Sequence, residues 1–170
     1  MDTATKIAAG LERAFVAQGL AEPNVEALRE AANVSLRTLY KYTPSRSEMV
    51  LTALEYRHSR YIAHVFDDLP APGPDALAAV ITKVGAWMAQ EAERGCLFQA
   101  AVAAAPRDQR LHALLKKHKS DVAKRAAQAG GVEEFETDIA VIIEGLTQSW
   151  PLLQNAAVSS ALRLARSVQG

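Results

Sequence analysis

The sequence predicts an all-α protein, and three observations support this fold class. Apolar residues recur every three or four positions along almost the whole chain, which is the spacing of helices with one buried face. Nowhere do β-branched residues alternate with polar ones over the length of a strand. Glycine and proline are few, 9 and 7 among 170 residues, and most of the breaks between about nine predicted helices contain one of them.

The first two helices are delimited by residues that favour helix ends. A helix is predicted over residues 4–18, where Gly19 follows as a natural C-cap. Asn24 is suited to the N-cap of a short second helix. Asn33 ends this helix, because asparagine is one of the few residues other than glycine that tolerate a positive φ.

Two serines mark the starts of the next two helices. Ser35 is the expected N-cap of a third helix that runs to Tyr42. Ser45 and Glu48 have the spacing of a capping box, in which serine is the N-cap and glutamate the third helical residue. A long fourth helix is therefore predicted from this point to about residue 66.

A single linker rich in proline and glycine, residues 69–75, follows the fourth helix, and we place the main organisational boundary of the chain near it. Beyond the linker, the same stop signals predict five more helices, over residues 75–93, 96–105, 106–128, 132–154 and 156–168.

Composition excludes several classes of protein. The charges balance at 19 Lys and Arg against 19 Asp and Glu, so binding of nucleic acid would need a local basic patch. The four histidines lack the spacing of a metal site. The one cysteine, Cys96, is either a small buried residue or a redox-sensing thiol. No arrangement typical of a catalytic site is present, and no apolar run is long enough for a membrane span or a signal peptide. We expect a cytoplasmic protein that is not an enzyme and has no cofactor, no metal and no membrane contact.

Residues 25–43 have the pattern of two short helices around a tight turn. Ala32 is small enough to let helices approach closely, while Val34 and Leu39 are apolar residues that would fill the corner. The second helix would present a set of hydrogen-bond donors with little apolar bulk. This set is what a recognition helix in a major groove requires; it consists of Ser35, Arg37, Thr38, Lys41 and Tyr42.

The run Asn33-Val34-Ser35-Leu36-Arg37-Thr38-Leu39-Tyr40-Lys41-Tyr42, followed by Ser45-Arg46-Ser47-Glu48, resembles the TetR/AcrR family of bacterial transcriptional regulators. The resemblance covers roughly the first 50 residues. It implies an N-terminal three-helix DNA-binding domain over residues 1–46, with its helix-turn-helix at about 23–42. An effector-binding and dimerisation domain over residues 47–170 would follow.

The resemblance also implies roles for single residues. Thr38, Tyr42 and Arg46 would contact phosphates, and Tyr40 would be either a core residue or a further phosphate contact. The residues nearest the bases would be Ser35, Leu36, Arg37 and Lys41. Arg57 and Arg60 in the fourth helix would add to the basic patch.

Three positions depart from the family pattern. The turn glycine is Asn33 here, and the lysine after the capping serine is Arg46, which can still neutralise a phosphate. The phenylalanine after the second aromatic residue is replaced by Thr43. This last change removes an apolar residue from the core and is expected to loosen the junction with the fourth helix.

A small-molecule effector, mostly apolar, is a further implication of the resemblance. Its pocket would lie among the middle helices, where several large side chains occur. These side chains would either line the pocket or simply pack in the core. The candidates are Tyr61, Trp87, Met88, Phe98 and Trp150. A second basic stretch at residues 107–125 is either a solvated helix face or a mouth that attracts an anionic effector.

The eighth predicted helix is apolar around most of its circumference, which indicates burial on two sides. A homodimer formed through the last two helices would bury both, and the candidate interface residues are Ile139, Ile143, Leu146 and Leu162. We expect a regulator, a repressor in the first instance, that binds a palindromic operator in double-stranded DNA as a homodimer and is released by its effector. The alternative is a helical dimerisation or adaptor protein that retains a degenerate helix-turn-helix.

Overall fold

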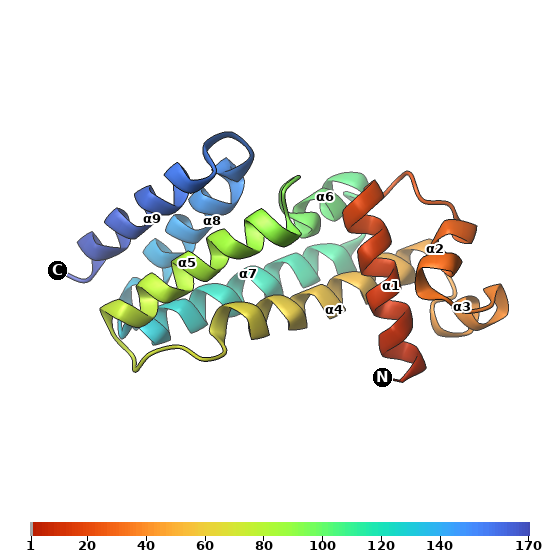
Figure 1. Cartoon of the computed structure of the whole chain (residues 1–170), viewed down its shortest axis with the longest axis horizontal. Coiled ribbons are helices and arrows are strands. Elements are labelled where there is room, and N and C mark those ends of the chain that lie inside the picture. Colours follow the sequence, from red (N-terminus) through yellow and green to blue (C-terminus); the bar gives the residue numbers. More distant parts are fainter. Residues whose placement is uncertain (1) are drawn as a thin grey trace. The chain divides into compact units, whose positions relative to one another are not determined.

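The computed structural model describes residues 2–170, and within that range it contains nine α-helices, one short 3-10 helix and no strand (Figure 1). The predicted all-α class is confirmed. The helices are α1 (Thr3–Gln18), α2 (Val25–Ala32), α3 (Leu36–Tyr42), α4 (Arg46–Phe66), α5 (Pro74–Glu91), α6 (Leu97–Ala104), α7 (Gln109–Gly130), the 3-10 helix η1 (Glu133–Phe135), α8 (Glu136–Leu153) and α9 (Asn155–Val168). None of these helices has both the length and the apolar character needed to cross a bilayer.

The chain folds into two compact units. Unit 1 contains the residues up to 60 together with 97–115, and unit 2 contains 61–96 and 116–170. Unit 1 is therefore larger than the N-terminal domain expected over residues 1–46, because the first part of α4, the whole of α6 and the start of α7 pack with α1–α3. The proline-rich linker lies inside unit 2 and does not divide the units.

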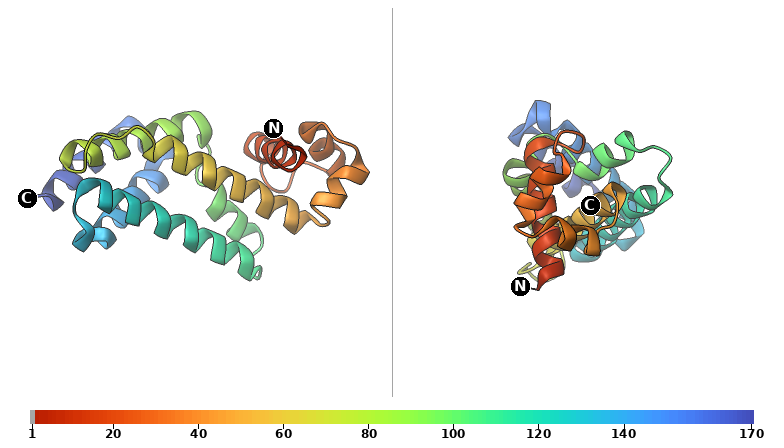
Figure 2. Two further views of the ribbon diagram at one scale, coloured as in Figure 1. Left: turned by 90° about the horizontal axis from the view of Figure 1, so that it is seen from below. Right: turned by 90° about the vertical axis from the view of Figure 1, so that its right-hand side faces the viewer.

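Helices α1 and α2 of unit 1 cross at a very short distance. A Cβ atom on Gly10 would lie only 2.4 Å from the Cα of Ala32, so glycine is required on α1 at the crossing point. Figure 2 shows α1 and α2 grouped with α3 from two further directions. This crossing fixes the base on which the helix-turn-helix is built.

A buried charge cluster joins α1 to α4. The carboxylate of Glu12 is almost fully buried and accepts hydrogen bonds of 2.8 Å from the guanidinium groups of both Arg57 and Arg60. Arg57 is also buried, whereas the Arg60 side chain is one-third exposed. Because each charge has a partner, the cluster satisfies the carboxylate that the bundle removes from water.

Unit 2 has a mainly apolar core to which α5, α7, α8, α9 and the end of α4 contribute. Aliphatic residues such as Ile81 and Ile139 fill it, and Tyr61 packs edge-on against the rings of Trp87 and His118 at centroid distances of 5.2 and 5.0 Å. Within this unit, α5, α8 and α9 pack side by side in Figure 1.

Candidate nucleic-acid interface

Local hydrogen bonds define the helix-turn-helix formed by α2 and α3. The Asn24 side chain accepts a 2.9 Å hydrogen bond from the N–H of Ala27, and the Ser35 hydroxyl accepts one of 3.1 Å from the N–H of Thr38. Asn33 between the helices has φ 51° and ψ 54°, in the left-handed region. Both predicted N-caps and the predicted turn at Asn33 are confirmed.

Thr43 stands at the junction between α3 and α4, and the loosening expected there stays a prediction. Thr43 is buried, and its hydroxyl donates a 2.9 Å hydrogen bond to the carbonyl of Leu39, which is itself fully buried. A polar side chain is accepted in the core here because its one donor is paired. Threonine thus replaces the apolar contact of the family pattern with a hydrogen bond to the end of α3.

The outward face of α3 carries most of the residues predicted to contact DNA. The hydroxyls of Ser35 and Thr38 lie 2.8 Å apart at the start of the helix. Tyr40 is more than two-fifths exposed, so it is a surface residue and not part of the core. Leu36 and Thr38 are half-buried; the exposed members of the predicted set are Ser35, Arg37, Tyr40, Lys41 and Tyr42, together with Arg46 at the start of α4.

Arg46 makes contacts that the sequence did not predict. Its guanidinium group donates hydrogen bonds of 2.5 Å to the carbonyl oxygens of Leu20 and Pro23, and it lies 5.1 Å from the centre of the Phe15 ring. Partial burial lowers the pKa of Arg46 from its ordinary value. Although Arg46 is exposed, these bonds tie the start of α4 to the loop between α1 and α2.

The basic patch is smaller than the sequence suggested. Arg57 and Arg60 are paired with Glu12 inside unit 1, so the prediction that they belong to the patch was wrong. Their partner is 45 and 48 positions away, and a count of charges along α4 does not reveal it. The exposed cations that remain of the predicted patch are Arg37 and Lys41 on α3 and Arg46 at the start of α4.

Hydrogen bonds also hold the first turn of α4 to the start of α7. The Ser47 hydroxyl donates a 2.6 Å hydrogen bond to Asp108, and Arg110 forms an ion pair with Glu48. The Ser47 hydroxyl and two backbone N–H groups lower the pKa of Asp108, and the bond to Glu48 raises the pKa of Arg110. The Ser45 hydroxyl accepts a 3.2 Å hydrogen bond from the N–H of Glu48, as the predicted capping box requires.

The five residues predicted for an effector pocket are all at least nine-tenths buried, and the structure does not bring them together in one unit. Tyr61, Trp87, Met88 and Trp150 fill the core of unit 2, whereas Phe98 belongs to unit 1. In the basic stretch at 107–125, Lys117 pairs with Asp121 on the same helix and Lys119 with Glu144 on α8.

The interface residues predicted on α8 point into their own unit. Ile139, Ile143 and Leu146 are at most 3% exposed, so their assignment to a surface covered by a second chain was wrong. An apolar run does not reveal which of its faces is turned inward. The exposed apolar side chains of α8 and α9 are others, namely Val141, Leu152, Leu153 and Leu164, while Leu162 is half-buried.

Cys96 is half-buried, and its sulfur lies 3.8 Å from the Nζ atom of Lys119. Among residues 2–170, no three His, Cys, Asp or Glu side chains are grouped in a way that could hold a metal ion.

The fold and the α2–α3 site together define a helix-turn-helix protein. No family model matches the chain, and no curated protein does either. Solved structures do match. A TetR-family transcriptional regulator from Streptomyces coelicolor has 19% identity and a TM-score of 0.76 over 98% of this chain and 94% of its own.

Two other solved structures agree with the first. A TetR transcription regulator from Haloarcula marismortui has 14% identity and a TM-score of 0.74, covering 99% of this chain and 96% of its own. The reduced form of Escherichia coli NemR has 16% identity and a TM-score of 0.75, covering 100% and 99%. The chain therefore has the fold of TetR-family transcriptional regulators, which confirms the resemblance at the level of the fold.

Proposed function

We propose that the chain is a DNA-binding transcriptional regulator whose α3 enters the major groove of double-stranded DNA. One observation carries the proposal: α3 exposes Arg37 and Lys41 while Leu39 anchors its opposite face in the core. Cationic side chains replace counterions at phosphates, and an arginine can donate two hydrogen bonds to the edge of a guanine. The fold shared with TetR-family regulators supports the same function.

Position on α3 separates two kinds of contact. The N-terminal part of a recognition helix faces the base edges, so Arg37 is the residue most suited to select a base. Tyr40 and Tyr42 carry hydroxyl groups that suit phosphate oxygens. The proposed base contacts are Ser35, Leu36, Arg37 and Lys41, and the proposed phosphate contacts are Thr38, Tyr40 and Tyr42. Because the guanidinium of Arg46 is engaged by two carbonyl oxygens, we now assign it to positioning rather than to phosphate binding.

A homodimer would place two recognition helices on one palindromic operator. Val141 and Leu152 on α8 are 66% and 88% exposed, so this helix presents apolar surface that a second copy would bury. Successive major grooves on one face of DNA are about 34 Å apart, and both α3 helices must match that spacing. A small-molecule effector that favours another spacing would release the DNA. In the proposed function the bound dimer acts as a repressor, and this release restores transcription.

The test is DNA binding with a promoter fragment from beside the protein's own gene, measured by fluorescence anisotropy. Arg37→Ala should weaken specific binding by about 1–3 kcal/mol and relax the sequence preference. Arg46→Ala should lower affinity without changing the salt dependence, because we assign no phosphate to this residue. Lys116→Ala, an exposed change on α7 in unit 2, is the control and should leave affinity unchanged.

Each outcome discriminates between alternatives. Equal weakening of all sequences by Arg37→Ala would reassign this residue to a phosphate. A shallower salt dependence for Arg46→Ala would return it to the phosphate contacts. If the unaltered protein binds no DNA at low salt but still self-associates, the chain is instead a helical dimerisation or adaptor protein.

A further inference from the structure

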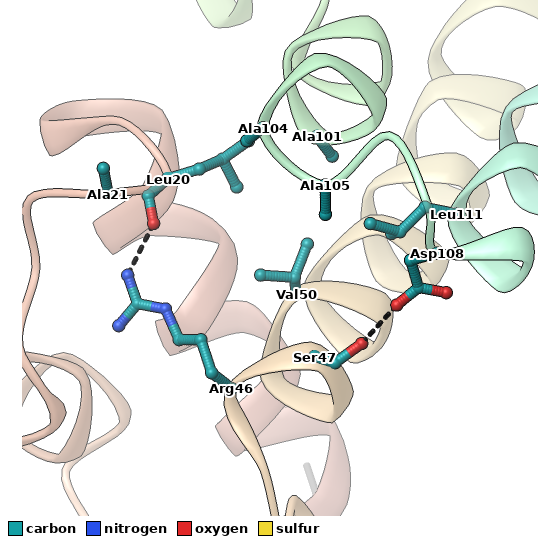
Figure 3. Close-up of a pocket in the computed structure, with 10 residues that line it drawn as sticks. All are labelled: Leu20, Ala21, Arg46, Ser47, Val50, Ala101, Ala104, Ala105, Asp108 and Leu111. Carbon is teal, nitrogen blue, oxygen red and sulfur yellow. Dashed lines mark hydrogen bonds between the residues drawn. The ribbon is translucent and has the colours of Figure 1, made fainter.

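Unit 1 contains a cavity of about 440 Å³, close to the helix-turn-helix and separate from the residues predicted for an effector pocket. Its lining comes from the loop after α1, the first turns of α4, the end of α6 and the start of α7, all within unit 1 (Figure 3). The lining residues are Leu20, Ala21, Arg46, Ser47, Val50, Ala101, Ala104, Ala105, Asp108 and Leu111. This volume is within the range of small-molecule sites, about 300–1,000 Å³.

The cavity wall is mainly apolar. Seven of the ten lining residues are alanine, leucine or valine. Val50, Ala101 and Leu111 are buried and form its interior, whereas Ala21 and Ala104 are exposed at its edge. The small alanine side chains leave open the space that larger residues would fill, so the volume follows from the sequence of α6 and its flanks.

The three polar side chains of the wall already have partners. Arg46 donates to the carbonyl oxygens of Leu20 and Pro23, and Ser47 donates to Asp108. Figure 3 shows Arg46 on one side of the apolar residues and the Ser47–Asp108 pair on the other. Arg46 and Asp108 carry opposite charges on the two sides of the cavity, so a charged ligand of either sign would meet a like charge as well as an opposite one and would lose its hydration. An uncharged apolar ligand would lose little.

We propose that this cavity is a binding site for an uncharged, mostly apolar small molecule. The occupant contacts the loop before α2 and the first turns of α4, the two segments that flank the helix-turn-helix in the sequence. Its binding stabilises unit 1 in the arrangement seen here, because a ligand that binds only the folded state raises stability by mass action. The proposed binding site does not depend on DNA binding by the chain.

The experiment uses two fluorescent probes that share one ring system and differ in charge. N-phenyl-1-naphthylamine is uncharged, and 1-anilinonaphthalene-8-sulfonate carries a sulfonate. The full-length protein should bind the uncharged probe at least about tenfold more tightly. Equal or tighter binding of the sulfonate would overturn the proposed ligand class.

Two substitutions locate the probe. Ala104→Trp and Ala21→Trp, both at exposed positions on the edge of the cavity, should each lower affinity for the uncharged probe by about tenfold or more. Ala103→Trp is the matched control, since this neighbouring residue of α6 is exposed but does not line the cavity, and its affinity should be unchanged. Circular dichroism establishes that each variant is folded, and if one is not, the other still tests the site.

Two results would overturn the proposal. Unchanged probe binding in the folded cavity variants would place the probe elsewhere. A lower sedimentation mass for Ala104→Trp than for Ala103→Trp would show that a second copy of the chain occupies the cavity. These measurements contain no DNA. A failure of the cavity proposal can therefore be distinguished from a failure of the proposed DNA binding.

Discussion

The two units use different chemistry to hold their helices together. Unit 1 combines apolar packing with a buried carboxylate on α1 that two arginines of α4 bind. Unit 2 buries aliphatic and aromatic side chains from α5, α7, α8, α9 and the end of α4. A charge cluster satisfies its groups only in one relative position of the two helices, whereas apolar side chains can repack at modest cost. Unit 1 therefore has the more exactly specified arrangement of helices, and it is the unit that carries the helix-turn-helix.

Loss of the buried carboxylate should be the most damaging change. Glu12→Ala leaves Arg57 buried without this partner, and we expect a loss of about 3–5 kcal/mol in the free energy of unfolding. Urea titration followed by far-ultraviolet circular dichroism measures it. Both tryptophans, Trp87 and Trp150, lie in unit 2, so their fluorescence follows that unit separately.

The control for this variant is Glu22→Ala, at an exposed position on the loop after α1, which should change stability by less than about 0.5 kcal/mol. If the two variants are equally stable, the cluster does not hold α1 to α4. The proposed difference in how the two units hold their helices together would then be wrong.

The next largest effect is expected on α8, where neighbouring positions differ in burial. Ile143→Ala creates a cavity in the core of unit 2 and should cost about 2–5 kcal/mol. Val141→Asp changes an exposed side chain and should leave the unfolding of unit 2 nearly unaltered, but it should dissociate the proposed dimer. Tryptophan fluorescence and sedimentation mass measure the two properties. A folded Val141→Asp dimer with full operator affinity would contradict the revised interface.

Gly10 and Gly85 allow a comparison of helix crossings in the two units. An alanine Cβ at Gly10 would lie 2.4 Å from the Cα of Ala32, whereas at Gly85 its closest contact is a methyl group of Val158, at 2.5 Å. A side chain can rotate away, but backbone cannot. We expect Gly10→Ala to cost about 1–3 kcal/mol, and Gly85→Ala to cost less. Thermal unfolding of both variants measures the difference, and the reverse order would show that α1 and α2 separate easily.

The smallest expected effect concerns Asp108. Its pKa is below the ordinary value of 3.8, chiefly because the Ser47 hydroxyl donates to its carboxylate. A carboxyl whose pKa is lowered by folding adds stability above its unfolded pKa, and this stability is lost as the pH falls through the folded pKa. Ser47→Ala should therefore raise the pKa of Asp108 and reduce stability at neutral but not at strongly acidic pH. Carboxyl titration by nuclear magnetic resonance measures the change; an unaltered pKa would exclude the Ser47 bond as its cause.

Local chemistry explains what could be predicted from the sequence. The caps at Asn24 and Ser35 and the turn at Asn33 depend on residues within a few positions of one another, so the helix-turn-helix was predictable residue by residue. The start of α8 could not be predicted in the same way, because the 3-10 helix η1 occupies Glu133–Phe135 before it.

Contacts between distant residues explain what could not be predicted. Arg46 is bound by main-chain carbonyls of Leu20 and Pro23, and main-chain acceptors leave no signature in the residue types. The pairing of Arg57 with Glu12 spans 45 positions. On α8, only the packing of the three helices decides that Ile143 points inward and Val141 outward.

The charge cluster around Glu12 also bears on how the protein responds to heat. Hydration of charged groups becomes less favourable as temperature rises, so the penalty for burying Glu12 and Arg57 decreases on warming. The apolar core of unit 2 has no comparable gain, because hydrophobic stabilisation per unit area levels off. The charge cluster therefore contributes relatively more to the stability of unit 1 as the temperature rises, and this favours retention of the packing that supports α3.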